Sequence, residues 1–318
     1  MPTRSNPDLS EAVAALKAGR LVAIPTETVY GLAADARNPD AVRAVFALKG
    51  RPADHPLIVH IAGAAQIAEW ASEVPPAAQA LAERFWPGPL TLILKKRADV
   101  PDAVTGGQDT VGLRCPDNAL TLALLREFGG GLAAPSANRF GRISPTDATH
   151  VREEFGDATP RVLDGGPCAV GIESTIVDLS RSPARILRHG RIGAEQLLPF
   201  LPGLQSGTDA GSPRVSGNLD AHYAPRTPMR LADRADIESG LAHDAVVLAL
   251  GALPTGARGL ALADEAHAYA QGLYAALRAL DALSAAEIVV ERPPQGAAWL
   301  AVNDRLRRAV TGSTLSAD

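Results

Sequence analysis

The chain has 318 residues, of which 46% are hydrophobic and 21% are charged, with a formal net charge of −4 and a pI near 6.0. Those values describe a globular protein long enough for two domains, and they argue against a broad nucleic-acid-binding surface while leaving room for a local basic cleft. No apolar run approaches the length of a membrane span and the N-terminus lacks the apolar stretch of a signal peptide, so we expect a cytoplasmic protein with no membrane partner.

Over residues 1–204 the apolar periodicity predicts helices and strands that alternate irregularly. The first helix is expected to begin at Ser10, which precedes Glu11, and to end at Gly19. Further helices are expected over 39–49, 77–85 and 120–128, and strands over 21–25, 57–61, 90–94, 110–114, 132–134, 161–163, 175–179 and 185–187. The irregular order predicts an α/β domain with a twisted mixed sheet.

Between Pro199 and Pro228 the periodicity stops, and Gly, Pro, Ser and Asp dominate. This composition is typical of a linker, which we place at 205–228. Strands over 229–231, 245–250 and 287–290 then alternate with helices over 235–242, 263–280 and 298–310. The regular alternation predicts a small Rossmann-like parallel-sheet domain over 229–318, without the glycine pattern that would assign it a dinucleotide.

Polar side chains gather where the predicted strands of the first domain end. Two threonines, Glu27 and Tyr30 follow the first strand, and Gly31 lets the backbone turn or approach another group closely. The alternative is a hydroxyl-rich turn that caps a helix. The two cysteines, Cys115 and Cys168, show neither a metal-binding spacing nor a neighbouring base, so we expect buried thiols and no covalent nucleophile.

Cations stand at the end of the predicted helix 39–49. Lys49 and Arg51 suit a clamp on phosphate or carboxylate, although cations also satisfy a helix C-terminus. At such a position the loss of either charge is expected to cost little stability. His60 is unusual in an apolar strand, and it is interpreted as a ligand contact because it follows the cations.

Three later clusters complete the pattern. Residues 134–146 carry hydroxyl, amide and guanidinium groups that suit a polyphosphate and a ribose, or else form a surface loop with a helix cap at Thr146. Glu173, Ser174 and Arg188 again place polar groups at strand ends. His222 and Tyr223 lie in the linker, where they either pin it to a domain or form a flap over the site. Together the clusters predict one cationic site for anions.

The chain resembles the threonylcarbamoyl-AMP synthase family in its long two-domain form, which has a YrdC-like first domain. The resemblance covers roughly residues 10–228 and is carried, in order, by the motifs PTETVYGL, KGRPADHPLIVHI, SANRFGRISPT, LDGG, GIESTIVDL, LRHGRI and HYAP. It implies a nucleotidyltransferase that converts ATP, L-threonine and bicarbonate into L-threonylcarbamoyl-AMP and pyrophosphate. The product then feeds tRNA threonylcarbamoyl-transferase machinery, which modifies the adenosine next to the anticodon.

The resemblance also implies roles for individual residues. Lys49 and Arg51 would be catalytic. The residues implied to contact L-threonine are Thr28, His60, Arg114, Ala134 and Ser174, and those implied to contact ATP are Arg51, His55, Thr110, Ser136, Asn138, Ser144, Arg188 and Tyr223. Because no Asp/Glu pair forms a metal site, Mg²⁺ is expected to arrive with ATP. The chain departs from the family at His55, Phe140 and His189, where Asn, Ser and Pro are common.

Two other functions stay open on the residues alone. One is an RNA-binding module whose cationic concave face holds tRNA. The negative net charge of the chain and its aromatic content of only 4% argue against this module. The other is a carbamoyltransferase, which would require carbamoyl phosphate and would not explain HYAP. Direct binding of tRNA by a synthase is a separate possibility that these residues leave undecided.

Overall fold

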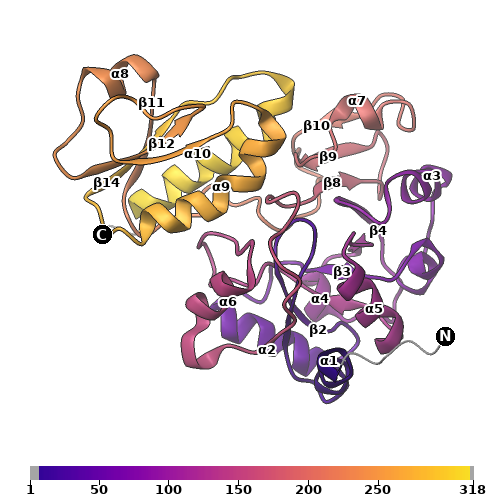
Figure 1. The fold of residues 1–318 in the computed structure, drawn as a ribbon. Helices are drawn as coiled ribbons and strands as arrows, with labels where there is room; N and C mark the ends of the chain where they lie inside the picture. The colour runs from indigo at the N-terminus through magenta and orange to yellow at the C-terminus, as the bar shows by residue number, and fades with distance from the viewer. Residues whose placement is uncertain (1–6, 316–318) are drawn as a thin grey trace, which may run out of the picture.

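The computed structural model describes residues 7–315, and the larger part of them folds around one mixed sheet (Figure 1). Its ten strands run in the order β10-β9-β8-β4-β5-β3-β6-β2-β1-β7. They are β1 (Val22–Ile24), β2 (Gly31–Asp35), β3 (Ile58–His60), β4 (Leu90–Lys95), β5 (Thr110–Arg114), β6 (Leu132–Ala133), β7 (Arg161–Val162), β8 (Thr175–Asp178), β9 (Arg185–Arg188) and β10 (Gln205–Ser206). Parallel and antiparallel pairs coexist, so the predicted mixed sheet is confirmed.

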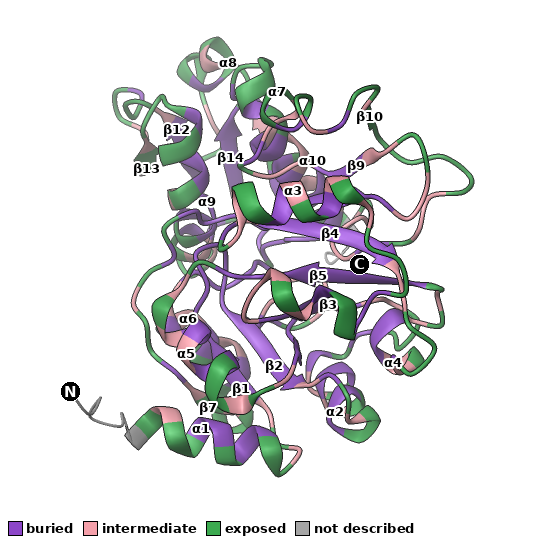
Figure 2. Cartoon of the chain, turned by 90° about the vertical axis from the view of Figure 1, so that its right-hand side faces the viewer, coloured by how far each residue is buried: buried purple, intermediate pink, exposed green. Residues whose placement is uncertain are grey.

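Helices cover the sheet: α1 (Pro7–Lys17), α2 (Pro39–Lys49), α3 (Pro76–Phe85), α4 (Asp102–Thr105), α5 (Ala119–Phe128), α6 (Ala148–Phe155), α7 (Ala194–Leu197) and the 3₁₀ turns η1 (Ala64–Glu69) and η2 (Gly156–Ala158). Helix α2 shows why its bounds follow from the sequence. The Asn38 side chain caps the first N–H groups, and Gly50 ends the helix with a φ of 63°. Lys49 is thereby placed in the last turn. In Figure 2 the strands β4 and β5 cross the centre of the molecule and are coloured as buried.

Several sequence predictions about the first domain need correction. Helix α6 was not predicted, and its cap is Asp147, whose side chain accepts the N–H of Thr149, and not Thr146. Helix α1 begins at Pro7, three residues before Ser10, because proline fits the first turn and Asp8 favours the helix N-terminus there. Strand β2 was not predicted, since GLAAD lacks the β-branched residues that mark strands. Gly31 is a point of close approach, not a turn: a Cβ there would lie 3.2 Å from the Cβ of Ala134.

The C-terminal part is a four-stranded parallel sheet of order β11-β14-β12-β13, which confirms the Rossmann-like prediction. Its elements are β11 (Met229–Ala232), α8 (Arg234–Ser239), β12 (Ala245–Leu250), β13 (Gly259–Leu262), α9 (Ala266–Asp281), β14 (Glu287–Glu291), η3 (Ala297–Trp299) and α10 (Leu300–Leu315). Strand β13 was missed, because Gly and Ala give it no strand signal. Helix α9 starts later than predicted, since the Glu265 side chain caps it.

The two domains pack against each other through an apolar interface. The C-terminal domain contributes α9 and α10, which face the larger domain in Figure 1. One buried cluster joins Val29, Ile143 and Ile172 to Tyr274 and Leu306 of the C-terminal domain. At Gly171 a Cβ would lie 2.4 Å from the Cα of Gln271, so the backbones nearly touch. The segment predicted as a linker, residues 205–228, begins with β10, which pairs with β9, and its remaining residues connect β10 to β11. Within residues 7–315 no helix is long and apolar enough to cross a membrane.

Candidate active site

One cavity brings together side chains from widely separated parts of the chain. The predicted site residues that line it are Thr28, Arg51, His60, Arg114, Ala134, Ser136, Arg188 and Tyr223. Glu173 and His222, which belong to the predicted clusters but had no implied ligand, also line it. The lining residues that the sequence did not indicate are Val29, Ile58, Pro135, Ser216 and Gly217. The cavity has a volume of about 50 Å³. The predicted meeting of strand-end clusters is therefore what the structure shows.

The first side of the cavity is made by the paired strands β3 and β5. His60 and Arg114 are partners in their parallel register, so both side chains arrive at one sheet edge. The Arg114 guanidinium lies 2.7 Å from the buried carboxylate of Glu27. Burial, and then the Arg114 charge, lower the pKa of His60 to about 3, which keeps the imidazole neutral. Its Nδ1 is buried without a hydrogen-bond partner in the described chain.

The threonines after β1 divide between the two interpretations given to them. The Thr26 hydroxyl donates to the Val29 carbonyl at 2.6 Å and accepts the N–H groups of Thr28 and Val29. It therefore forms the expected hydroxyl-rich turn, although the turn leads into β2 and caps no helix. Thr28, whose hydroxyl is 2.8 Å from that of Thr26, lines the cavity. Tyr30 points elsewhere and donates to the Gly166 carbonyl.

The other side of the cavity carries two guanidinium groups. Arg51 follows α2, and its Nη2 donates to the Pro56 carbonyl at 3.1 Å and to Ser216 Oγ at 3.2 Å. Arg188 ends β9 and donates from Nη1 to the Ser216 carbonyl at 2.8 Å and from Nη2 to Ser174 Oγ at 3.1 Å. Burial lowers the pKa of Arg51 to about 10, which leaves it charged near neutral pH. Ser216 of the linker thus occupies hydrogen-bond donors that suit an anion.

Lys49 and Asn138 do not line this cavity. The Lys49 Nζ donates to the carbonyls of Ser136 and Asn138, at 2.6 and 2.5 Å. Burial lowers the pKa of Lys49 well below its usual value. The Asn138 amide donates to the carbonyls of Arg139 and Arg142. Both residues therefore hold the loop over 134–146 in shape. Because Lys49 is buried and makes two hydrogen bonds, we now expect that its removal lowers stability, in contrast to the expectation from its position at a helix end.

The remaining predicted residues lie behind or beside the cavity. Ser144 Oγ donates to Glu173 at 2.7 Å, and Ser174 Oγ lies 2.8 Å from the Thr91 hydroxyl. Thr110 stands at the opposite end of β5 from Arg114 and lines a different small cavity. His55 packs edge-on against Phe140, with ring centroids 5.5 Å apart. The two departures at these positions thus contact each other, outside the cavity.

The linker supplies the residues that sequence reasoning placed least well. Tyr223 has a φ of 62°, is almost fully buried, and stacks on Tyr274 of the C-terminal domain with centroids 5.6 Å apart. Gly217 has a φ of 77°, and a Cβ there would lie 2.2 Å from the Tyr223 hydroxyl. Only glycine fits this approach. In the sequence, the Ser216-Gly217 pair shortly before the HYAP motif could have indicated these residues. Because the linker lacks periodicity, however, its course over the larger domain could not be predicted.

The cavity offers neither a reactive thiol nor a free carboxylate. Burial raises the pKa of Cys115 to about 11 and that of Cys168 to about 12. Glu173 is the only carboxylate among the residues that line the cavity, and it already accepts from Ser144, Tyr274 and Arg305. In residues 7–315 no group of three or more metal-ligating side chains is present.

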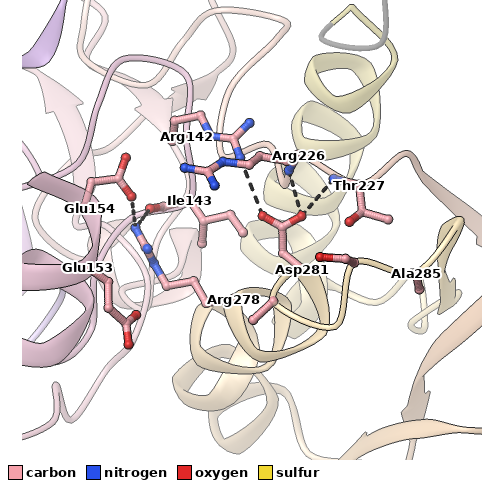
Figure 3. A pocket seen from close by; sticks show the side chains of 11 residues that line it. Arg142, Ile143, Glu153, Glu154, Arg226, Thr227, Arg278, Asp281 and Ala285 are labelled. Atoms are coloured by element: carbon pink, nitrogen blue, oxygen red, sulfur yellow. Dashed lines mark hydrogen bonds and ion pairs between the residues drawn. The ribbon is translucent and has the colours of Figure 1, made fainter. Parts of the chain in front are cut away.

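A larger cavity of about 530 Å³ lies between α6 and the end of α9 (Figure 3). Its charges are mostly paired with one another: Arg278 with Glu154 at 2.9 Å, and Arg142 with Asp281 at 3.5 Å. The other oxygen of Asp281 accepts the backbone N–H groups of Arg226 and Thr227, both at 2.8 Å. This cleft lies where the linker leaves for β11.

Comparison with known proteins identifies the family. A family model described as telomere recombination, Sua5/YciO/YrdC, matches residues 14–190, and the model of the threonylcarbamoyl-AMP synthase C-terminal domain matches residues 192–311. The chain belongs to the threonylcarbamoyl-AMP synthase family. The synthase of Pyrococcus abyssi is 38% identical over 310 residues, which cover 92% of this chain and 91% of that protein. The synthase of Bacillus subtilis is 37% identical over 337 residues, with 98% and 95% covered.

The fold agrees with the same family. The structure of P. abyssi Sua5 complexed with L-threonine superposes with a TM-score of 0.89 at 36% identity, covering 96% of this chain and 94% of that one. The resemblance stated from the motifs is confirmed, together with the predicted fold class and enzymatic character.

Proposed function

We propose that this chain joins L-threonine, bicarbonate and ATP into L-threonylcarbamoyl-AMP and releases pyrophosphate. The observation that supports the proposal best is the single cavity, in which residues from five strand ends and the linker meet and which three guanidinium groups line, those of Arg51, Arg114 and Arg188. The synthases that share 91% or more of their length with this chain carry the same activity in their names. The product would feed tRNA threonylcarbamoyl-transferase machinery, and we expect the enzyme to work in the cytoplasm, where tRNA and ATP are available.

The chemistry requires two bond-forming steps. The threonine amine attacks the carbon of bicarbonate, and water leaves to give a carbamate. A carbamate oxygen then attacks the α-phosphorus of ATP, and the bond to the β-phosphate oxygen breaks as pyrophosphate departs. All species are anionic, so the protein's main tasks are orientation and charge neutralisation. No covalent enzyme intermediate is required, in keeping with the raised thiol pKa values.

We assign L-threonine to the side of the cavity made by Thr28, His60, Arg114 and the backbone at Ala134, called here the threonine side. Arg114 would pair with the substrate carboxylate, because Glu27 already fixes the guanidinium in place. His60 is neutral, and its unpartnered Nδ1 can bond the substrate without adding charge. Ser174 lies behind this side and holds Arg188.

We assign ATP to the nucleotide side, made by Arg51, Ser136, Arg188, Ser216 and Tyr223. Arg51 and Arg188 would contact the phosphates with the donors that Ser216 now occupies. Lys49 would act in catalysis by fixing the carbonyls of the loop over 134–146, and Asn138 and Ser144 support the same loop. Thr110 and His55 would reach ATP only through parts of it that extend beyond this cavity. Mg²⁺ would arrive on the ATP phosphates.

We further propose that the linker is a lid. A volume of about 50 Å³ is far below the roughly 300–1,000 Å³ of ligand pockets, so ATP enters only if residues 216–223 move outward. Ser216, Gly217, His222 and Tyr223 line the cavity from the linker. Once closed over substrates, the lid would keep water from the labile mixed anhydride.

The test is the reaction itself, with the purified full-length chain, ATP, Mg²⁺, L-threonine and bicarbonate, and without tRNA. We expect threonylcarbamoyl-AMP by mass spectrometry, and pyrophosphate release that stops when threonine or bicarbonate is omitted. Pyrophosphate release that continues without threonine contradicts the proposal. Activity that requires carbamoyl phosphate would support a carbamoyltransferase, and tRNA binding without product would support an RNA-binding module.

A further inference from the structure

Glu173 is a carboxylate at the wall of a site that must attract anions. It is buried, 7% exposed, and lines the cavity beside Arg188. An unpaired carboxylate there would repel triphosphate or would bind the guanidinium groups intended for it. Its surroundings show how this conflict is resolved.

Three donors hold the Glu173 carboxylate, and two of them come from the C-terminal domain. Oε2 accepts from the Tyr274 hydroxyl at 2.9 Å and from Arg305 Nε at 3.0 Å, while Oε1 accepts from Ser144 at 2.7 Å. The Arg305 side chain has no exposed surface, so solvent screens the attraction between its charge and the Glu173 carboxylate only weakly. Burial alone would raise the pKa of Glu173, but Arg305 and then Arg188 lower it to about 2.

The same two residues also hold the lid. Arg305 lies over the Tyr223 ring, 5.5 Å from its centroid. Tyr274 stacks on the same Tyr223 ring at an interplanar angle of 27°. One turn further along α10, Arg308 bonds the carbonyl of Leu219, and its own carbonyl accepts the N–H of His222. Helix α10 thus contacts both the carboxylate in the cavity wall and the segment that covers the cavity.

We infer that Arg305 and Tyr274 are positioning residues of the nucleotide side: they engage Glu173, so that Arg188 and Arg51 remain available for the phosphates of ATP. The inference rests on the proposed assignment of ATP to this side. It gives the C-terminal domain a part in catalysis, although none of its residues lines the cavity. Neither residue touches substrate, and both act through Glu173 and Tyr223.

The decisive experiment is a charge rescue in the full-length protein. Arg305→Met removes the partner of Glu173, and we expect the KM for ATP to rise at least tenfold while the KM for threonine changes less than twofold. Adding Glu173→Gln removes the unpaired charge, so the double variant should recover ATP KM to within about threefold of the wild type. A purely structural role of Arg305 would affect both substrates and would not be rescued.

Arg230→Met is the matched control. Arg230 lies on the edge strand β11 of the same domain, its side chain is 44% exposed, and it pairs with Glu287 of β14. Its turnover, with that of the wild type, establishes the synthase reaction independently of the inference. An unchanged ATP KM in Arg305→Met, or a double variant no better than the single one, overturns the inference. If Arg305→Met is insoluble, Tyr274→Phe replaces it: a twofold to fivefold rise in ATP KM supports the inference and no change overturns it.

Discussion

The threonine side of the cavity is built by strands of one sheet, whereas the nucleotide side is assembled from three parts of the chain. His60 and Arg114 are register partners of β3 and β5, and Glu27 fixes Arg114 at 2.7 Å. Arg51 and Arg188 come from the larger domain, but their donors meet Ser216 of the linker, which α10 in turn contacts through Leu219 and His222. The comparison implies a threonine side formed before substrates arrive and a nucleotide side that changes with the lid.

The largest effect should follow from Arg51→Ala. Removing a guanidinium that neutralises phosphate is expected to lower turnover about 100-fold or more, with little change in threonine affinity. Arg43→Ala, on the exposed face of α2 with a side chain 62% exposed, is the control and should keep normal turnover. The readouts are pyrophosphate release and threonine binding by calorimetry. Near-normal turnover in Arg51→Ala would remove this residue from the nucleotide side.

Lys49→Met should lower both stability and activity. Without Nζ the buried carbonyls of Ser136 and Asn138 lose their donor, which is expected to cost about 1–3 kcal/mol of unfolding free energy. Turnover should fall about tenfold, because the loop that carries Ser136 to the cavity loosens. Urea unfolding and turnover are measured on the same preparation. An intact unfolding midpoint with abolished turnover would instead indicate direct contact with substrate.

Tyr223→Ala should lower the yield of threonylcarbamoyl-AMP per ATP consumed, by roughly severalfold, since an unlatched lid admits water to the anhydride. Tyr223→Phe is the matched control: the hydroxyl has no partner in the described chain, so the ring alone should preserve most of the yield. Product and ATP are quantified together by chromatography. A wild-type yield and ATP KM in Tyr223→Ala would make the linker a simple tether.

Acid should destabilise the threonine side through His60. Its folded-state pKa, about 3, lies below the ordinary 6.5, so the unfolded chain binds more protons between those values. Unfolding free energy should therefore fall as the pH drops below about 6.5, by up to about 1.4 kcal/mol per pH unit. His60→Asn should flatten this slope in urea titrations at pH 7, 6 and 5. His222→Asn should flatten it less, because a linker that opens locally can accept a proton without unfolding the protein.

The smallest effect is expected at the joint between linker and C-terminal domain. Asp281→Ala removes the acceptor of the Arg226 and Thr227 N–H groups, and ATP KM should rise about twofold to fivefold with threonine KM unchanged. Asp281→Asn keeps an acceptor oxygen and should stay close to wild type. Equal rises in both KM values would show that the two sides are not independent.

The sequence predicted the parts of this fold that carry a strong local signal. Runs such as 90–94 and 245–250 were found because buried strands are rich in Val, Ile and Leu. Strands β2 and β13 were missed, since Gly and Ala pack between neighbours without any strand propensity of their own. At β2 and β13, tertiary contacts and not local propensity therefore decide that the chain forms a strand.

The site divides in the same way. Residues that follow strands, such as His60, Arg114 and Arg188, converge because strand ends share a sheet edge, and this could be expected from their positions. The predicted strand 110–114 already separates Thr110 from Arg114, but which of its two ends lies at the cavity depended on the tertiary structure. Ser216 and Glu173 required the path of an aperiodic linker and the docking of a second domain.

The backbone of Tyr223 has a consequence for how the enzyme would recycle. A left-handed conformation costs an ordinary L-residue about 1–2 kcal/mol, and Tyr223 adopts one with a φ of 62° while its ring is stacked on Tyr274. In the proposed lid, the stacked ring of Tyr223 would favour the closed state, whereas the left-handed backbone of the same residue would oppose it. Loss of the stacking would shift the proposed lid toward the open state, and relief of the strain in this one residue would contribute to product release.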